Sequence, residues 1–139
     1  MKDVIINIKG TQGLGEDKTV LELSSEGTLS REGENFVLSY FEDNVIKGAK
    51  IETTLTAFKN KGIELERQGD LRSKLLIEEG VRNNCFYTVP EGSLTLGIFG
   101  KEVTASLTES GGEIKMVYTI DADMRLISEN TVEIKIRER

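Results

Sequence analysis

The sequence contains no histidine and no tryptophan, and cysteine and proline each occur once in 139 residues. Without histidine the chain cannot form a Ser-His or Cys-His nucleophilic pair, and it lacks the commonest general base at neutral pH and a frequent zinc ligand. A single cysteine, Cys85, cannot form an internal disulfide, and this thiol usage is typical of a cytoplasmic protein. These absences favour a cytoplasmic location and exclude the commonest nucleophilic mechanisms.

Long apolar runs and clustered positive charge are also missing. No run approaches the ~18 residues that a membrane-spanning helix needs, and the opening "MKDVIINIKG" has no small-residue cleavage site of a secretory signal. The net charge is -6, from 24 acidic and 18 basic residues, whereas nucleic-acid-binding and membrane-surface proteins are more often basic. We therefore expect neither nucleic acid nor membrane among the partners.

The composition that remains is that of a soluble globular protein, with 37% hydrophobic and 30% charged residues. The length suits one domain covering residues 1–139. Five segments alternate apolar and polar residues, the period of half-buried strands. These segments are 51–57, 63–66, 93–98, 103–107 and 132–137.

Turn motifs rich in glycine and polar residues separate these segments at intervals of about 8–12 residues, a spacing found in sandwiches and barrels. The turn motifs are "GLGEDK" (13–18), "SSEG" (24–27), "REGEN" (31–35), "EDN" (42–44), "KNKG" (59–62), "QGD" (68–70), "EEG" (78–80), "PEG" (90–92), "GK" (100–101) and "SGG" (110–112). No window shows a convincing helical stripe, and residues 69–80, the best helix candidate, are assigned to a strand.

We predict an all-β fold, a closed antiparallel meander barrel of about 8–10 strands. Consecutive short strands with short connections form a meander, and closure removes its exposed edges. The lumen of such a barrel is either filled by side chains or able to hold one small ligand. In "CFYTVPEGSLTLGIFG" (85–100), Pro90 and Gly92 predict a hairpin turn between strands ending at Val89 and starting at Ser93, and Cys85 is a small apolar strand residue.

No sequence motif indicates catalytic, metal-binding or cofactor-binding residues. The glycine-rich "GTQGLGEDKT" (10–19) lacks the spacing of a phosphate-binding loop and of a dinucleotide fingerprint, and a strand rather than a helix follows it. The carboxylate pairs Glu64 with Glu66 and Asp121 with Asp123 are typical of solvated strand faces and turns. An enzyme that works without histidine, through carboxylates, tyrosine or lysine, remains an alternative.

Arg67 breaks the alternation of its own strand, because it follows Ile63 and Leu65 on the face predicted to point inward. A charge on that face must be paired or hydrogen-bonded. Arg67 is therefore either a structural lock between strand ends or an anchor for a carboxylate or phosphate, which arginine binds in a bidentate manner. Tyr40 and Tyr118 also fall on apolar faces, either as core residues or as the wall of a ligand site.

Five stretches form a characteristic series: "DVIINIKGTQ" (3–12), "LERQGDL" (65–71), "IEEG" (77–80), "FYTVPEGSLTLG" (86–97) and "GGEIKMVYTID" (111–121). The series resembles the YwiB-like family, small uncharacterised bacterial proteins with a calycin-like β-barrel. The resemblance covers nearly the whole chain. It implies a closed antiparallel barrel similar in outline to lipocalins and fatty-acid-binding proteins, and it implies no activity.

Within this resemblance, the Arg-x-Gly element of the family falls on residues 67–69 and a Tyr-Thr element on residues 87–88. These matches draw attention to Arg67, Tyr87 and Gly92 without giving them roles. Many calycins pack a basic residue across a tryptophan at the closed barrel end, and this chain has no tryptophan. Lipocalin ligand binding therefore does not transfer directly.

The leading hypothesis is a non-enzymatic protein that binds a small, partly apolar or anionic ligand in the barrel, with Arg67 as anchor and Tyr40, Tyr87 and Tyr118 as wall residues. The second hypothesis is a filled structural barrel that acts through protein contacts, as a homodimer. For the second hypothesis we expect three phenylalanines on outward strand faces, a sign of a contact surface. These are Phe41, Phe58 and Phe99.

Overall fold

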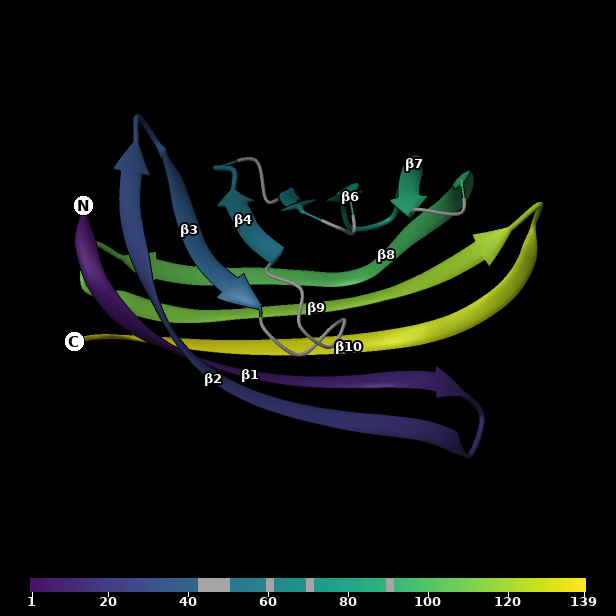
Figure 1. The fold of residues 1–139 in the computed structure, drawn as a ribbon, viewed down its shortest axis with the longest axis horizontal. Helices are drawn as coiled ribbons and strands as arrows, with labels where there is room; N and C mark the ends of the chain where they lie inside the picture. Colours follow the sequence, from purple (N-terminus) through teal and green to yellow (C-terminus); the bar gives the residue numbers. More distant parts are fainter. Residues whose placement is uncertain (43–50, 60–61, 70–71, 90–91) are drawn as a thin grey trace.

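The computed structural model describes residues 1–42, 51–59, 62–69, 72–89 and 92–139, which form ten antiparallel strands closed into a barrel (Figure 1). The strands are β1 Lys2–Leu14, β2 Asp17–Glu32, β3 Asn35–Glu42, β4 Ile51–Ala57, β5 Ile63–Gln68, β6 Arg72–Ile77, β7 Arg82–Val89, β8 Gly92–Thr108, β9 Gly111–Ala122 and β10 Arg125–Glu138. Each strand pairs with its neighbours in sequence, and β1 closes the barrel on β10. The predicted closed meander is confirmed, with ten strands. No helix in the described residues is long and apolar enough to cross a membrane.

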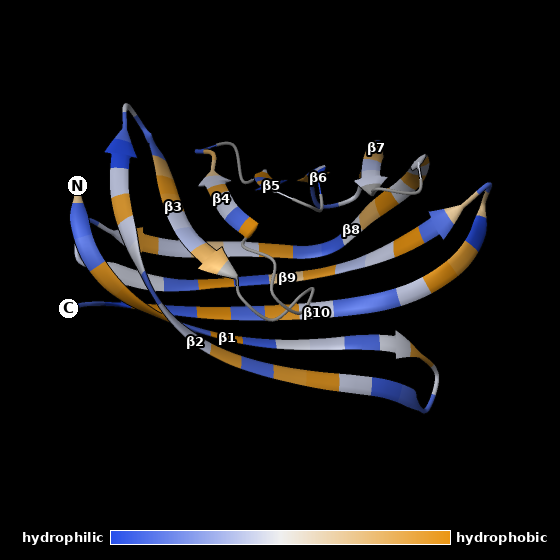
Figure 2. Ribbon diagram, viewed as in Figure 1, coloured by the Kyte–Doolittle hydropathy of each residue, from blue (hydrophilic) through white to orange (hydrophobic). Residues whose placement is uncertain are grey.

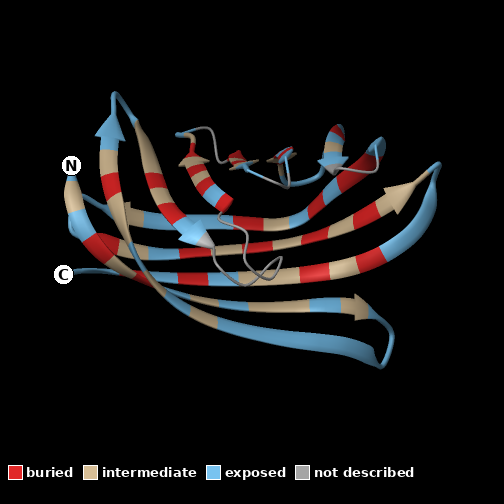
Figure 3. Cartoon of the chain, in the orientation of Figure 1, coloured by how far each residue is buried: buried red, intermediate tan, exposed pale blue. Residues whose placement is uncertain are grey.

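Alternating burial shows why these segments form strands. Along β4, Ile51, Leu55 and Ala57 are buried, while Glu52 is exposed. The same alternation appears as orange and blue bands along the strands in Figure 2 and as red and paler bands in Figure 3. Since successive side chains point to opposite faces, one face of each strand supplies the apolar core of the barrel.

Two glycine-containing motifs that predict turns lie inside long strands instead. "SSEG" (24–27) belongs to β2, and "GK" (100–101) lies in β8, where the pairing with β9 shifts register between Gly100 and Glu102. A Cβ on Gly27 would lie 2.4 Å from the carbonyl oxygen of Ser39, and one on Gly100 would lie 2.2 Å from that of Glu78. These glycines therefore permit close backbone approach rather than chain reversal, and the predicted strands 93–98 and 103–107 are one bulged strand.

Other predicted turns are found where expected. Two-residue turns at 15–16 and 33–34 join β1 to β2 and β2 to β3. The predicted Pro90 turn lies outside the described residues, although β7 ends at Val89 and β8 begins at Gly92. Cys85 is buried on β7, as predicted, and burial raises the pKa of its thiol. A raised pKa makes the thiol a weaker nucleophile at neutral pH.

The barrel has two unequal walls. Strands β1, β2, β8, β9 and β10 have 12 to 17 residues, whereas β3 to β7 have six to eight. We call these the long-strand wall and the short-strand wall. Figure 1 shows the long strands running past the short ones on the side away from both termini. The inner surface of the long-strand wall therefore continues beyond the short-strand wall.

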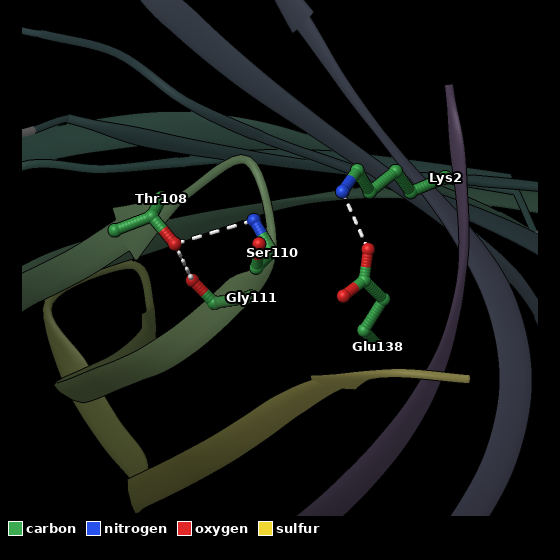
Figure 4. Close-up of polar contacts among 5 residues, drawn as sticks. All are labelled: Lys2, Thr108, Ser110, Gly111 and Glu138. Carbon is green, nitrogen blue, oxygen red and sulfur yellow. Dashed lines mark hydrogen bonds and ion pairs between the residues drawn. The ribbon is translucent and has the colours of Figure 1, made fainter.

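Polar contacts fasten the barrel at the end where the termini lie (Figure 4). Lys2 on β1 forms an ion pair with Glu138 on β10. In the β8–β9 turn, the hydroxyl of Thr108 accepts a hydrogen bond from the Ser110 amide at 3.2 Å and donates to the Gly111 carbonyl at 3.3 Å. The buried apolar side chains of both walls form one core cluster. Its aliphatic members include Val4, Leu29, Leu38, Leu55, Ala57, Ile63, Leu65, Leu75, Ile77, Leu96, Ile98, Val103, Ile114, Ile120 and Ile136.

A bidentate ion pair crosses the outer face of β8. The Arg82 guanidinium donates to the two carboxylate oxygens of Asp121, at 3.0 and 2.6 Å. It lies over Gly97, where a Cβ would come within 2.2 Å of the guanidinium. These hydrogen bonds from Arg82 lower the pKa of Asp121. The pair therefore ties β7 to β9 across an intervening strand.

This ion pair predicts a pH-dependent contribution to stability. The pKa of Asp121 is lower in the folded protein than in the unfolded chain. The ionised Asp121 carboxylate therefore stabilises the fold fully above the unfolded-state pKa of about 3.9, and this stabilisation is lost as the pH falls through the folded-state pKa. We expect Asp121→Asn to be less stable than wild type at neutral pH, with the difference narrowing below about pH 4. Urea unfolding at both pH values measures this, with Asp123→Asn as the control. A pH-independent difference would contradict the assignment.

Candidate functional site

Five polar side chains form a continuous row across the inner face of the short-strand wall. In the strand register, Tyr40 on β3 lies opposite Thr53 on β4, Thr53 opposite Arg67 on β5, Arg67 opposite Ser73 on β6, and Ser73 opposite Tyr87 on β7. We call these five residues the inner polar row. Directly opposite residues on adjacent strands have Cβ atoms about 4.5–5.5 Å apart. The row therefore brings together side chains that are far apart in sequence.

The inner polar row is largely shielded from solvent. Tyr40, Thr53 and Ser73 are 4%, 0% and 5% exposed, and Arg67 and Tyr87 are half-buried. The positions on either side of Arg67 in the row are thus buried, which places Arg67 on the inner face. Polar groups in such surroundings need hydrogen-bond or charge partners.

The two half-buried members of the row interact electrostatically. Burial raises the pKa of the Tyr87 hydroxyl, and the positive charge of Arg67 opposes this rise only in part. Tyr87 therefore remains a protonated phenol at neutral pH and can donate a hydrogen bond. A cation and a hydroxyl donor on one face form a surface that favours an anion.

Ser73 lies between these two residues in the row. Its hydroxyl oxygen is buried and has no hydrogen-bond partner within the described part of the chain. A buried hydroxyl left in this state costs about 1–3 kcal/mol. An oxygen atom of a bound molecule would satisfy it, and the neighbouring Arg67 would supply the charge.

A second polar cluster lies on the inner face of the long-strand wall. Tyr118 on β9 is opposite Asn130 on β10, and the Asn130 amide nitrogen donates to the Ser128 hydroxyl at 3.1 Å. All three side chains are buried. The structure therefore unites three of the predicted residues, Tyr40, Arg67 and Tyr87, in one row and places Tyr118 in a separate cluster.

Among the residues that the structure describes, four buried polar residues were not predicted as site residues: Thr53, Ser73, Ser128 and Asn130. For two of them a sequence signal exists. Thr53 alternates in phase with apolar residues of β4, and Ser73 alternates in phase with apolar residues of β6. A serine or threonine in phase with the apolar residues of a strand therefore indicates a polar group on the inner face.

The outer surface carries exposed aromatic side chains and open depressions. Phe41 and Phe99 are 56% and 37% exposed, as expected, whereas Phe58 is half-buried; Phe86, which was not predicted, is 66% exposed. A depression of about 430 Å³ lies over β5, β6 and β7. It is bordered by Arg67 and Ser73 of the inner polar row and by residues of the outer face of these strands: Glu66, Gln68, Arg72, Lys74, Phe86 and Thr88. Within the described ranges, no three His, Cys, Asp or Glu side chains are placed to hold a metal ion.

Comparison with known proteins gives a family and a fold. A family model described as a domain of unknown function, DUF1934, matches residues 6–134. The crystal structure of the ywiB protein from Bacillus subtilis is similar, with a TM-score of 0.88 over 99% of this chain and 92% of that chain. The sequence identity is 17%, so this likeness shows a shared lipocalin-like fold alone. No curated protein gives a significant match.

Proposed function

Because the chain belongs to the DUF1934 family, whose description names no function, we propose from its inner face that it is a non-enzymatic cytoplasmic protein that binds a small, partly apolar anion. The inner polar row holds the anionic group, and Arg67 is its anchor. The buried hydroxyl of Ser73, which has no hydrogen-bond partner in the described residues, carries this proposal. An anion oxygen placed beside Ser73 would also meet the guanidinium of Arg67 and the phenol of Tyr87, which occupy the adjacent positions in the row.

The residues next to the row provide the apolar part of the site. On the inner face of β5, β6 and β7, the residues two positions from Arg67, Ser73 and Tyr87 are Leu65, Leu75 and Cys85. All three are buried. A ligand that combines an anionic head with an apolar body therefore finds complementary groups along the same three strands.

The filled structural barrel remains the second candidate function. The core cluster favours it, because apolar side chains from both walls pack against one another in the interior. In that alternative Arg67 is a structural lock, and the protein acts through contacts with other chains. The two candidates differ in what removal of the Arg67 charge would change: ligand affinity in the first, and stability alone in the second.

Titration with anilinonaphthalene sulfonate, an apolar ring system with a single negative charge, tests the anchor role by fluorescence. We expect saturable binding to the wild type and a loss of at least about tenfold in affinity for Arg67→Met, since a hydrogen bond to a charged group contributes roughly 1.5–3 kcal/mol. Arg137→Met is the matched control, because Arg137 lies on β10 of the other wall with an exposed side chain. Equal affinities for wild type and Arg67→Met, or no saturable binding by the wild type, would contradict the proposal.

A further inference from the structure

Among the described residues, the half of β2 next to the β1–β2 turn has no strand partner on the side away from β1, and we call it the free edge. β2 pairs with β1 from Asp17 to Leu29, but its pairing with β3 begins only at Gly27. In the described residues, positions 17–24 therefore have no strand on the side away from β1. Figure 1 shows this part of β2 along the lower margin of the molecule, and Figure 3 shows it exposed. An edge of this length is a template for pairing with another chain.

The hairpins on both sides of β2 fix which backbone groups point to this free edge. A two-residue turn joins Leu14 to Asp17, and another joins Glu32 to Asn35. The residues that close such a turn exchange hydrogen bonds with each other, and hydrogen-bonded positions then alternate along the strand. Both turns give the same result: the backbone groups of odd-numbered β2 residues form hydrogen bonds with β1, and those of even-numbered residues point to the side of β2 away from β1. The amide and carbonyl groups of Val20, Glu22 and Ser24 therefore point to the free edge, as does the carbonyl of Lys18, whereas the Lys18 amide donates to the Glu16 carbonyl within the turn at 3.1 Å.

The side chains of this edge are complementary to those of a second copy of the chain. In an antiparallel pair with a two-fold axis at Val20, the two Val20 residues lie opposite each other. Lys18 of each chain then faces Glu22 of the other, so two ion pairs flank the apolar centre on one face. Lys9 of β1 lies opposite Glu22 within the same chain, and the carboxylate would sit between two lysines. In this register the two Val20 residues exchange backbone hydrogen bonds, and the Lys18 carbonyl of each chain accepts from the Glu22 amide of the other.

We propose that the protein forms a homodimer through antiparallel pairing of β2 with β2, centred on Val20. Val20, which is 58% exposed, packs against Val20 of the other copy, and the sheet of one long-strand wall continues into the other. Such a dimer is isologous, since each copy contributes the same surface. The interface lies on β2, whereas the inner polar row lies on β3 to β7, so dimerisation and ligand binding are independent.

Sedimentation velocity over a concentration series, in the micromolar to millimolar range, tests the charge complementarity. We expect a monomer–dimer equilibrium for the wild type. Lys18→Glu creates two like-charge contacts by symmetry and is expected to raise the dimer Kd about tenfold at low salt. Because Lys18 faces Gly13 within its own chain, this change disturbs no ion pair with the residue opposite it. The double variant K18E/E22K restores opposite charges and is expected to recover most of the affinity. A wild type that is monomeric throughout, or no effect of Lys18→Glu, overturns the proposal.

Disulfide trapping tests the register separately. Val20→Cys would place two thiols opposite each other with Cα atoms about 5.5 Å apart, within the range that a disulfide spans. Glu22→Cys would place its thiols four residues out of register, roughly 13 Å apart, too far to bridge. We expect oxidation to give a covalent dimer from Val20→Cys only, and the wild type, whose Cys85 is buried, to give none. Equal trapping of both variants, or of Glu22→Cys alone, overturns the register.

Discussion

Replacing Leu55 with alanine is expected to lower the free energy of unfolding by about 3 kcal/mol. Leu55 lies at the centre of β4 with 1% of its surface exposed, and its register partners Leu38 and Leu65 are also buried. Substitutions of this kind remove apolar contacts and leave a cavity, with typical losses of 2–5 kcal/mol. Because three adjacent strands meet at this residue, the surrounding side chains cannot collapse to fill the space.

Urea unfolding followed by circular dichroism measures this loss. Thr56→Ala is the matched control, because the neighbouring side chain points to the outer face and is only partly buried. Its effect is expected to stay below about 1 kcal/mol. A loss of less than 1 kcal/mol for Leu55→Ala would show that the interior near β4 is not closely packed and would contradict the close packing of Leu55 between its neighbouring strands.

Gly27→Ala is expected to destabilise the protein by about 2–3 kcal/mol, although it adds a single methyl group. A Cβ at this position would lie 2.4 Å from the backbone carbonyl oxygen of Ser39 and 2.7 Å from the side chain of Ile6. Overpacking of a closely packed site costs about 1–3 kcal/mol, and here the nearest atom is backbone, which cannot rotate away. Tyr40, which lies opposite Gly27 at the start of the inner polar row, would be displaced.

Gly10 provides a matched control for this prediction. It also lies within a strand of the long-strand wall, but a Cβ there would meet nothing within 4 Å. Gly10→Ala is therefore expected to leave the free energy of unfolding within about 0.5 kcal/mol of wild type or to raise it, because alanine restricts the unfolded chain. Equal losses for the two variants would indicate that glycine flexibility, and not the close contact with Ser39, governs stability at Gly27.

The sequence predicted the fold well because alternation and turn spacing are local signals. The strand around Leu55 and the inward position of Arg67 both follow from period two. The signal failed at Gly27 and Gly100, where glycine was interpreted as a turn residue. At these positions glycine serves contacts with Ser39 and with residue 78, which are distant in the chain, and no local pattern reveals such contacts.

The candidate site was only partly predictable for a related reason. Arg67 was found because a charge on an apolar face is conspicuous, whereas Ser73 on the same kind of face resembles an ordinary strand residue. The row itself depends on the register of five strands, which places Tyr40 and Tyr87 four strands apart but in line. Register is fixed by the packing of the whole barrel and is not visible in any one segment. Tyr118 looked equivalent to Tyr40 in sequence and lies on the other wall.

Native mass spectrometry of the protein purified from the cells that produce it naturally tests the proposed ligand site most directly. The proposal predicts a species heavier than the chain by the mass of a small molecule, which disappears on denaturation and is absent from Arg67→Met. Arg137→Met should retain the bound molecule. A wild type that shows only the mass of the bare chain, or of its dimer, would contradict ligand binding at the inner polar row and leave the filled barrel as the account of this fold.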